Sequence, residues 1–274
     1  MRKCIFLALF CVNTLFGLDV FVGKTTIITL EQIDLDAPVY LEDMQIFSQP
    51  NPKNKKEQLL LIAIDYKSKL GEQTIRYMYN KSPREIRLHV RDVAYKSEKL
   101  QVIPDKVSPP KKYQDIIYEE YKEAMDIYKL STPNLYWSEP FVYPLESQTT
   151  SDFGNARVFN GSLKSYHSGI DFKAAIATPV KASNDGIVVL AKERYYAGGS
   201  VIIDHGFGVY SCYFHLSDFA KKVGDAVKRG EIIGLSGQSG RVTGPHLHFA
   251  FKIRGTSTDP LDFIKKINAL VANK

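Results

Sequence analysis

Five of the six histidines lie in the second half of the chain, where they form short segments suited to binding a metal ion or moving protons. His167 and Asp171 are four residues apart, His246 and His248 are separated by one residue, and His215 ends an apolar alternation. Histidine nitrogen and carboxylate oxygen are both ligands that zinc accepts at about 2.0 to 2.2 Å. The residue types are therefore those of a catalytic zinc site.

The spacing of these residues predicts how they point. Residues two apart in a β-strand face the same side, about 6 to 7 Å apart, so His246 and His248 present two rings to one side. One of the pair can bind a metal while the other faces the substrate. His167 and Asp171 can converge on one ion across a turn that contains Gly169. Three protein ligands leave the fourth position of zinc open for water, which is the catalytic arrangement.

The segments that must position these side chains read as short strands with Gly-rich turns between them. From residue 137 onward, turns are marked by pairs such as Gly198-Gly199 and Gly224-Asp225. We expect an antiparallel β-sheet domain over residues 134–274. Its predicted strands are residues 180–190, 200–204, 208–215, 232–235 and 246–253.

The first half of the chain also has β-branched and alternating segments, and Pro-containing turns separate them. We expect a small β domain over residues 18–108, with a regulatory or docking role. A helical connector over residues 109–133 follows, because apolar and aromatic residues recur at steps of three and four in residues 111–129. The fold class is therefore mainly β. The predicted strands of the first domain are residues 25–30, 39–47, 58–64, 74–79 and 85–90.

Residues 1–17 read as a signal peptide. Arg2 and Lys3 precede an apolar run that is too short for a membrane span, which needs about 20 residues, and Gly17 is a suitable small residue before cleavage. We therefore expect export without a transmembrane span in the mature chain. An acylated Cys11 is disfavoured because Phe10 precedes it. The mature chain keeps Cys212 alone, which cannot form an internal disulfide and which we expect to be a buried structural thiol.

The charge is +6, from 36 basic and 30 acidic residues. Removal of Arg2 and Lys3 leaves 34 basic and 30 acidic residues, or +4. This small excess suits an anionic polymer such as a cell wall, and it is too dispersed to indicate nucleic-acid binding.

The order of the motifs in the second half resembles the lysostaphin-type, LytM-like zinc metallopeptidases. The resemblance covers about residues 151–264, and its co-occurring segments are far more specific than a lone His-Leu-His. It includes residues 151–154, 167–171, 204–206, 213–216, 223–225, 233–234, 243–249 and 259–260.

By position, the resemblance implies one zinc ion per chain, bound by His167, Asp171 and His248. His215 and His246 would be the catalytic histidines. One would take a proton from water, while the other stabilises the oxyanion or protonates the leaving amine. The sequence leaves open which does which, and it contains no His-Glu-x-x-His segment to supply a glutamate base.

Two histidines are expected to lie outside the site. His205 follows Asp204 in a turn where family members usually have a structural residue. His89 shares the polar face of its predicted strand with Arg87 and Arg91, so we expect it at the surface.

The resemblance also implies a substrate. Family members cut peptidoglycan, so we expect an enzyme of the periplasm or cell envelope that acts on peptidoglycan stem peptides. The expected activity is that of a D,D-endopeptidase on D-alanyl-diaminopimelate cross-links, with D,D-carboxypeptidase activity as an addition. A regulatory protein partner is an open question. The first 105 residues lack peptidase motifs, and their domain could occlude the active-site groove or serve folding and docking.

Two other functions are open to test. The first is a non-hydrolytic LytM-like activator of a cell-wall amidase, which the five intact site positions argue against. The second is a secreted bacteriocin that cuts pentaglycine bridges, which the lack of a wall-targeting module after residue 264 argues against.

Overall fold

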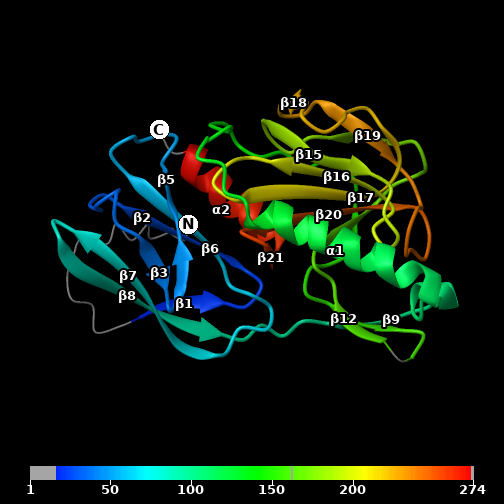
Figure 1. The fold of residues 1–274 in the computed structure, drawn as a ribbon, viewed down its shortest axis with the longest axis horizontal. Coiled ribbons are helices and arrows are strands. Elements are labelled where there is room, and N and C mark those ends of the chain that lie inside the picture. The colour runs from blue at the N-terminus through cyan, green and yellow to red at the C-terminus, as the bar shows by residue number, and fades with distance from the viewer. Residues whose placement is uncertain (1–16, 162, 273–274) are drawn as a thin grey trace, which may run out of the picture.

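The computed structural model describes residues 17–161 and 163–272, which form a mainly β fold. Figure 1 shows two β-rich halves side by side, with one helix across the second half and another between the halves. The expected fold class is confirmed. Except for Gly17, the predicted signal peptide lies outside the described residues. Among the described helices, none combines the length and the apolarity needed to cross a bilayer.

The N-terminal half contains a five-stranded sheet in the order β1-β8-β7-β3-β4 and a three-stranded sheet in the order β2-β6-β5. The expectation of one strand over residues 39–47 is wrong. Glu42 has a positive φ of 51°, which turns the chain into a hairpin of two short strands. The strands are β1 (Leu18–Phe21), β2 (Thr25–Leu30), β3 (Val39–Leu41), β4 (Met44–Ile46), β5 (Ser48–Pro50), β6 (Gln58–Ala63), β7 (Gly71–Tyr79) and β8 (Ser82–Arg91).

Strand β6 is buried on both faces and joins the two halves. Leu60 and Ile62 point into the core of the N-terminal half, whereas Leu59 and Leu61 point into the core of the C-terminal half. Because side chains alternate along a strand, one apolar run can serve two cores.

Between the halves, the chain forms β9 (Ser97–Leu100), two short 3₁₀ turns and α1 (Gln114–Lys129). Strand β9 pairs in parallel with β11 (Ala156–Phe159), which in turn pairs with β12 (Leu163–Tyr166). The helix expected over residues 111–129 is confirmed, with its first turn in the 3₁₀ form. A strand from the predicted N-terminal domain therefore belongs to the same small sheet as a hairpin of the C-terminal half.

The C-terminal half is built on a ten-stranded sheet whose main path runs β10-β13-β20-β17-β16-β15-β18. Residues 180–190 are not one strand as expected. Ser183 and Asn184 leave the sheet to bond the backbone of Val142 and Glu139, so the run divides into two strands. The strands are β10 (Thr149–Ser151), β13 (Ile170–Lys173), β14 (Pro179–Lys181), β15 (Gly186–Lys192), β16 (Gly199–Asp204), β17 (Val209–Phe219), β18 (Ala226–Val227), β19 (Ile232–Ser236), β20 (His246–Ile253) and β21 (Thr256–Thr258).

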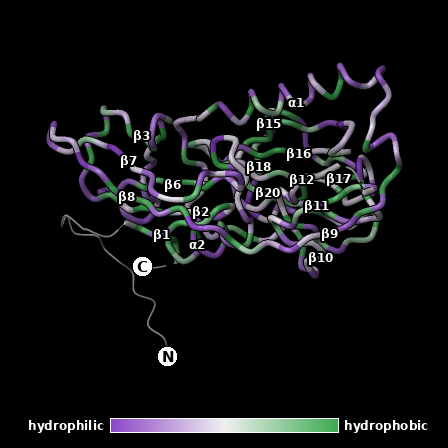
Figure 2. Tube along the Cα trace, turned by 90° about the horizontal axis from the view of Figure 1, so that it is seen from below, coloured by the Kyte–Doolittle hydropathy of each residue, from purple (hydrophilic) through white to green (hydrophobic). Residues whose placement is uncertain are grey.

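The two faces of this sheet have different roles. On β20, Leu247 and Phe249 point into the large core, which also contains Trp137 and helix α2 (Pro260–Ala272). On the opposite face, Ala250 packs under Tyr128 of α1. Figure 2 shows α1 lying along one side of the molecule beside β15 and β16. Since His246 and His248 alternate with Leu247, they lie on the same face as α1.

Helix α2 was not among the expected elements, although the sequence carries its signals. Asp259 Oδ1 accepts the N–H of Leu261 at 2.9 Å, and Pro260 occupies the first helical position. Buried residues then recur at helical spacing: Phe263, Ile264, Ile267 and Val271.

Candidate active site

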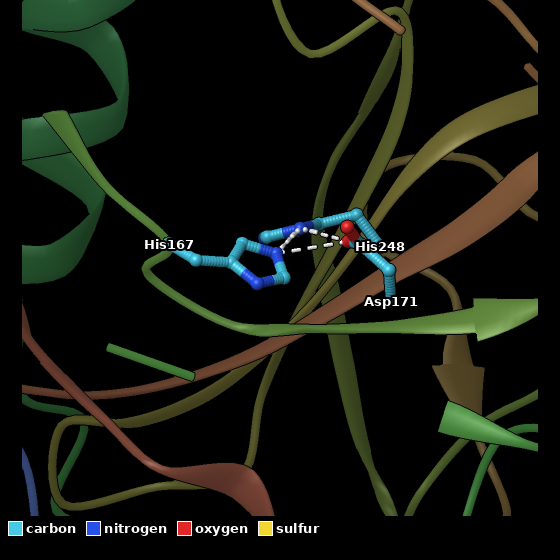
Figure 3. A group of neighbouring side chains, drawn as sticks. All are labelled: His167, Asp171 and His248. Atoms are coloured by element: carbon cyan, nitrogen blue, oxygen red, sulfur yellow. Dashed lines mark hydrogen bonds and ion pairs between the residues drawn. The ribbon is translucent and has the colours of Figure 1, made fainter. Parts of the chain in front are cut away.

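Two neighbouring strands bring the predicted metal ligands together. Asp171 of β13 and His248 of β20 are direct cross-strand partners, and His167 lies in the segment that enters β13. His167 Nε2, His248 Nδ1 and Asp171 Oδ1 each lie 2.9 Å from the other two (Figure 3). All three residues are buried, and together they form a group able to hold a metal ion.

The protonation of this cluster suits a cation. His167 Nδ1 donates to the backbone oxygen of Asp152 at 2.8 Å, so in the neutral ring Nε2 carries a lone pair toward the other two ligands. Burial lowers the pKa of His248 to about 4. Burial alone would raise the pKa of Asp171, but its contacts with His167 and His248 hold that pKa well below its usual range. A neutral pair of imidazoles and a carboxylate fit zinc, which accepts such donors.

A second layer of polar residues holds the ligands in place. Arg157 Nη2 donates to Asp171 Oδ2 at 2.7 Å, and Arg157 Nε donates to Glu98 Oε2 at 3.2 Å. The other oxygen of Glu98 accepts from Ser151 Oγ at 2.8 Å and from Asn155 Nδ2 at 2.6 Å. Burial opposes ionisation of Glu98, but these hydrogen bonds and Arg157 lower its pKa overall. Glu98 therefore balances the charge of Arg157, which donates a hydrogen bond to the candidate metal ligand Asp171.

The two predicted catalytic histidines lie beside the metal cluster. The ring centroids of His215 and His246 are 4.8 Å apart, and His246 Nε2 lies 3.7 Å from Asp171 Oδ1. His215 Nδ1 donates to the Ser239 backbone oxygen at 2.8 Å. His246 Nδ1 donates to that of Gly244, also at 2.8 Å. In the neutral form, each ring therefore keeps an unprotonated Nε2 that can accept a proton.

His215 is held by an unusual backbone conformation and by its neighbours. Its φ of 66° is rare for a residue with a side chain and accompanies a register irregularity in the pairing of β17 with β16. Burial, followed by the nearby His246 and His248, lowers the pKa of His215 to about 3. This histidine is thus neutral at pH 7 and able to act as an acceptor.

Helix α1 supports this histidine through a loop. The Glu120 carboxylate accepts the N–H of Tyr195, with the shorter contact at 2.9 Å, and the Ala197 carbonyl accepts the N–H of His215 at 2.9 Å. The loop over residues 193–198 therefore connects a carboxylate of the connector helix to a candidate catalytic residue.

The structure brings all five predicted site residues into one cluster. Sequence reasoning missed the supporting residues Glu98 and Arg157. Glu98 lies 59 positions before Arg157 and 53 before Ser151, so no local pattern could have linked them. Ser151 was noted only as part of a motif.

The remaining histidines lie outside the cluster, as expected. The ring of His205 is fully buried and contacts the Asp185 backbone oxygen and Ser211 Oγ, both at 2.7 Å. His89 lies on β8 with its ring 3.2 Å from Glu72. Cys212, predicted to be a structural thiol, is buried against the Tyr128 hydroxyl at 3.3 Å.

Comparison with known proteins gives a consistent family match. Residues 165–260 match Peptidase family M23. Peptidoglycan DD-endopeptidase ShyA of Vibrio cholerae is 41% identical over 134 residues, which are 48% of this chain and 29% of that protein. DD-carboxypeptidase/endopeptidase Mpg of Neisseria meningitidis is 39% identical over 123 residues, or 45% of this chain and 28% of that protein. The chain therefore aligns with under a third of the length of these relatives.

A solved structure matches over most of the chain. The crystal structure of a Pseudomonas aeruginosa protein assigned to peptidase M23 has a TM-score of 0.71 and 24% sequence identity. The match covers 89% of this chain and 94% of that one, so the similarity in fold extends over both halves.

Proposed function

We propose, because residues 165–260 match Peptidase family M23, that the protein is a zinc-dependent peptidase that cuts peptide cross-links of bacterial peptidoglycan. The observation that carries the proposal is the buried group of His167, Asp171 and His248 with His215 and His246 beside it. A metal-binding role alone would not explain the neighbouring pair of histidines, and a role in proton transfer alone would not explain the buried group of His167, Asp171 and His248.

In this proposal, His167, Asp171 and His248 hold one zinc ion. Bound there, zinc would supply Lewis acidity that lowers the pKa of water from about 15.7 to about 7 and polarises the scissile carbonyl. Arg157 orients the Asp171 carboxylate through its contact with Oδ2. The Asp152 carbonyl fixes the tautomer of His167, a role typical of groups that surround a metal site.

The two remaining histidines carry the proton transfers. A neutral Nε2 of His215 or His246 accepts the proton of the attacking water. The same proton is then available for the leaving amine, which must be protonated to depart. The partner ring can donate a hydrogen bond from Nε2 to the developing oxyanion once it has taken up a second proton from bulk solvent. The assignment of the two roles between His215 and His246 stays open.

We further propose that the protein is exported and works in the periplasm or cell envelope on stem peptides. D,D-endopeptidase activity on D-alanyl-diaminopimelate cross-links is the main expected reaction, with removal of a terminal D-alanine as a second. The names of the similar relatives support this substrate class, and the small basic excess of the chain suits an anionic polymer.

A muropeptide digest tests the proposal. Residues 18–274 would be incubated with cross-linked peptidoglycan, with zinc or with a chelator, and the products resolved by mass spectrometry. We expect chelator-sensitive conversion of dimers to monomers. Zinc binding without any change in the muropeptides would contradict the proposal and favour the non-hydrolytic activator.

Substitutions separate metal binding from catalysis. His167→Ala should lose both zinc and turnover, whereas His246→Ala should retain one zinc per chain and lose turnover. His89→Ala is a matched control, because that histidine lies on β8 outside the cluster. Retained turnover in His246→Ala would refute the role of that residue.

A further inference from the structure

Among the residues that the structure describes, no acidic side chain pairs with the guanidinium group of Arg241, which lies in a loop next to the candidate active site. It stands in the loop between β19 and β20, two residues after Ser239, whose carbonyl accepts from His215. The Arg241 backbone N–H donates to the Tyr196 carbonyl at 2.8 Å. The loop is thus held against residues 193–198, the same loop that supports His215.

Two aromatic rings hold the guanidinium. Its central carbon lies 4.5 Å from the ring centroid of Phe159 and 4.6 Å from that of Tyr196. Arginine stacks readily on aromatic faces, and this stacking leaves its N–H groups free in the plane of the group. The side chain is therefore oriented without using its hydrogen-bond donors.

Strand β11 connects this guanidinium to the metal cluster. Phe159 and Arg157 are two residues apart on β11, so they lie on the same face about 6 to 7 Å apart. Arg157 contacts Asp171, while Phe159 contacts Arg241. The guanidinium is thus linked to the metal cluster through Phe159 and Arg157, and to His215 through the loop over residues 193–198.

The donors of this arginine are unused. Across the side chains of residues 17–161 and 165–272, no hydrogen bond or ion pair with the Arg241 side chain is present, whereas Arg157 binds Glu98 and Asp171. Burial lowers the pKa of Arg241, and the nearby charge of Arg157 acts in the same direction. Arg241 is only partly buried, so a ligand can reach it. A partly desolvated cation with free donors gains more from an anionic ligand than a fully hydrated one does.

We propose that Arg241 binds a free carboxylate of the substrate, namely the one on the carbon that bears the nitrogen of the cut amide. This inference rests on the proposed function. In a D-alanyl-diaminopimelate cross-link, that carbon carries a carboxylate. In a terminal D-alanyl-D-alanine, it carries the C-terminal carboxylate. One residue would therefore serve both the endopeptidase and the carboxypeptidase reaction.

The same contact gives specificity. An interior glycine of a peptide bridge has an amide where these substrates have a carboxylate, so it offers the guanidinium no anion. Arginine binds a carboxylate through two parallel hydrogen bonds, which lysine cannot reproduce. We expect the contact to favour carboxylate substrates over their amides by about tenfold to a hundredfold, the range of a hydrogen bond to a charged group.

Binding measurements test this without relying on turnover. A stem pentapeptide ending in D-alanyl-D-alanine and its C-terminal amide would be titrated calorimetrically into zinc-loaded residues 18–274 that carry His246→Ala to prevent cleavage. The same titrations would be made after adding Arg241→Gln, Arg241→Lys or Arg229→Gln. Arg229 is an exposed arginine on a different loop and serves as the matched control. Thermal melts would show whether each variant is folded.

The proposal requires that the carboxylate peptide bind more tightly than its amide in the parent and in Arg229→Gln. It also requires that Arg241→Gln abolish this difference and that Arg241→Lys retain only part of it. Equal binding of both peptides by the parent would overturn the proposal, as would an unchanged difference in Arg241→Gln. An equal loss for both peptides, with the preference kept, would also overturn it and leave Arg241 a structural role. The two proposals can fail separately. If Arg241→Gln lost the carboxylate preference while the unsubstituted protein left the muropeptides unchanged, the proposed function would be refuted and the carboxylate subsite would stand.

Discussion

Glycine at position 169 allows the candidate metal ligands to approach one another. A Cβ atom there would lie 2.4 Å from the Phe249 carbonyl oxygen and 2.7 Å from His248 Nε2. Both contacts are closer than real Cβ atoms allow, and one of them is backbone of the adjacent strand. Even the methyl group of alanine at position 169 would therefore displace His248 or the backbone of β20.

We predict that Gly169→Ala lowers zinc affinity by at least about tenfold, since displacement of His248 removes one of three ligands from its position. Zinc content after dialysis and thermal melts would measure the effect. Ser168→Ala, one residue earlier, removes an atom instead of adding one and should behave as the wild type. Normal zinc content in Gly169→Ala would show that β20 can move without cost.

His205 makes stability depend on pH. Burial lowers its pKa from 6.5 to about 4, so the folded protein keeps the ring neutral where the unfolded chain takes up a proton. Its contribution to stability is fully present above about pH 6.5 and is lost as pH falls toward about 4. The loss is at most about 3 kcal/mol.

We therefore predict that His205→Gln destabilises the protein most at neutral pH. The difference in unfolding free energy from the wild type should shrink by up to about 3 kcal/mol between pH 7.5 and pH 4. Urea unfolding at several pH values would measure it. A difference that stays constant with pH would mean that His205 does not titrate in this range.

The histidines and Asp171 could be predicted because residue type and order in the chain carry the information. Glu98, Arg157 and Arg241 could not, since each acquires its role from residues that folding brings near. An arginine reads as a surface residue in the sequence until the structure places it between two rings or between two carboxylates.

At the scale of elements, the candidate metal site depends on a strand that lies outside the region matched to Peptidase family M23. Glu98 lies on β9, before residue 165, yet it binds the arginine that contacts Asp171. Without the negative charge of Glu98, Arg157 would attract the Asp171 carboxylate more strongly and compete with the metal for it.

We predict that Glu98→Gln lowers zinc affinity about tenfold to a hundredfold, the usual range for residues that support a metal ligand. Turnover should recover at saturating zinc, because the five site residues remain. Competition with a zinc chelator would measure affinity. Lys99→Gln, exposed on the same strand, is the control. Unchanged affinity in Glu98→Gln would show that Arg157 alone positions Asp171.

The role of β9 also bears on the hypothesis that the N-terminal half occludes the groove. A chain that starts near residue 131 would lose β9, Glu98 and α1 together with the N-terminal strands. Low activity of such a chain could therefore follow from loss of Glu98 and α1 beside the site as readily as from loss of a docking surface in the N-terminal half. A rise in activity would favour occlusion.

Element boundaries were predictable where turn residues mark them, as before β20, and the expectation failed at Glu42, where the backbone turns without a glycine. Strand β20 was expected over the residues that form it, because Gly244-Pro245 marks a turn before it and its residues are mainly apolar. The break at Glu42 has no such signal, since the residue there is not a usual choice for a positive φ. The short strand β13 has only four residues, too few for a pattern, and its partner β20 determines it.

At the scale of the whole molecule, the two halves share strand β6 and are also joined by polar contacts. Thr25 Oγ1 lies 2.8 Å from Thr258 Oγ1 in a buried contact, and Lys24 pairs with Asp259 at 2.5 Å. The contacts of β6 lie on the core face of the large sheet, opposite the face of His246 and His248. These contacts favour docking over occlusion as the role of the N-terminal half.

A shared strand should make the halves unfold together. Leu88 is fully buried in the N-terminal core, whereas Trp137, the single tryptophan, is buried in the C-terminal core. We predict that Leu88→Ala lowers the unfolding free energy by about 2 to 5 kcal/mol, as for other large buried residues. The urea midpoint reported by Trp137 fluorescence should fall together with the midpoint reported by far-UV circular dichroism.

The reporter and the substitution lie in different cores, so the result distinguishes one cooperative unit from two. Leu35→Ala, at a site that is 67% exposed, should leave both midpoints nearly unchanged. If Leu88→Ala shifted the circular dichroism while the Trp137 midpoint stayed in place, the halves would be independent domains. A common shift would mean that Leu59 and Leu61 on one face of β6, with Leu60 and Ile62 on the other, transmit a loss of packing from one core to the other.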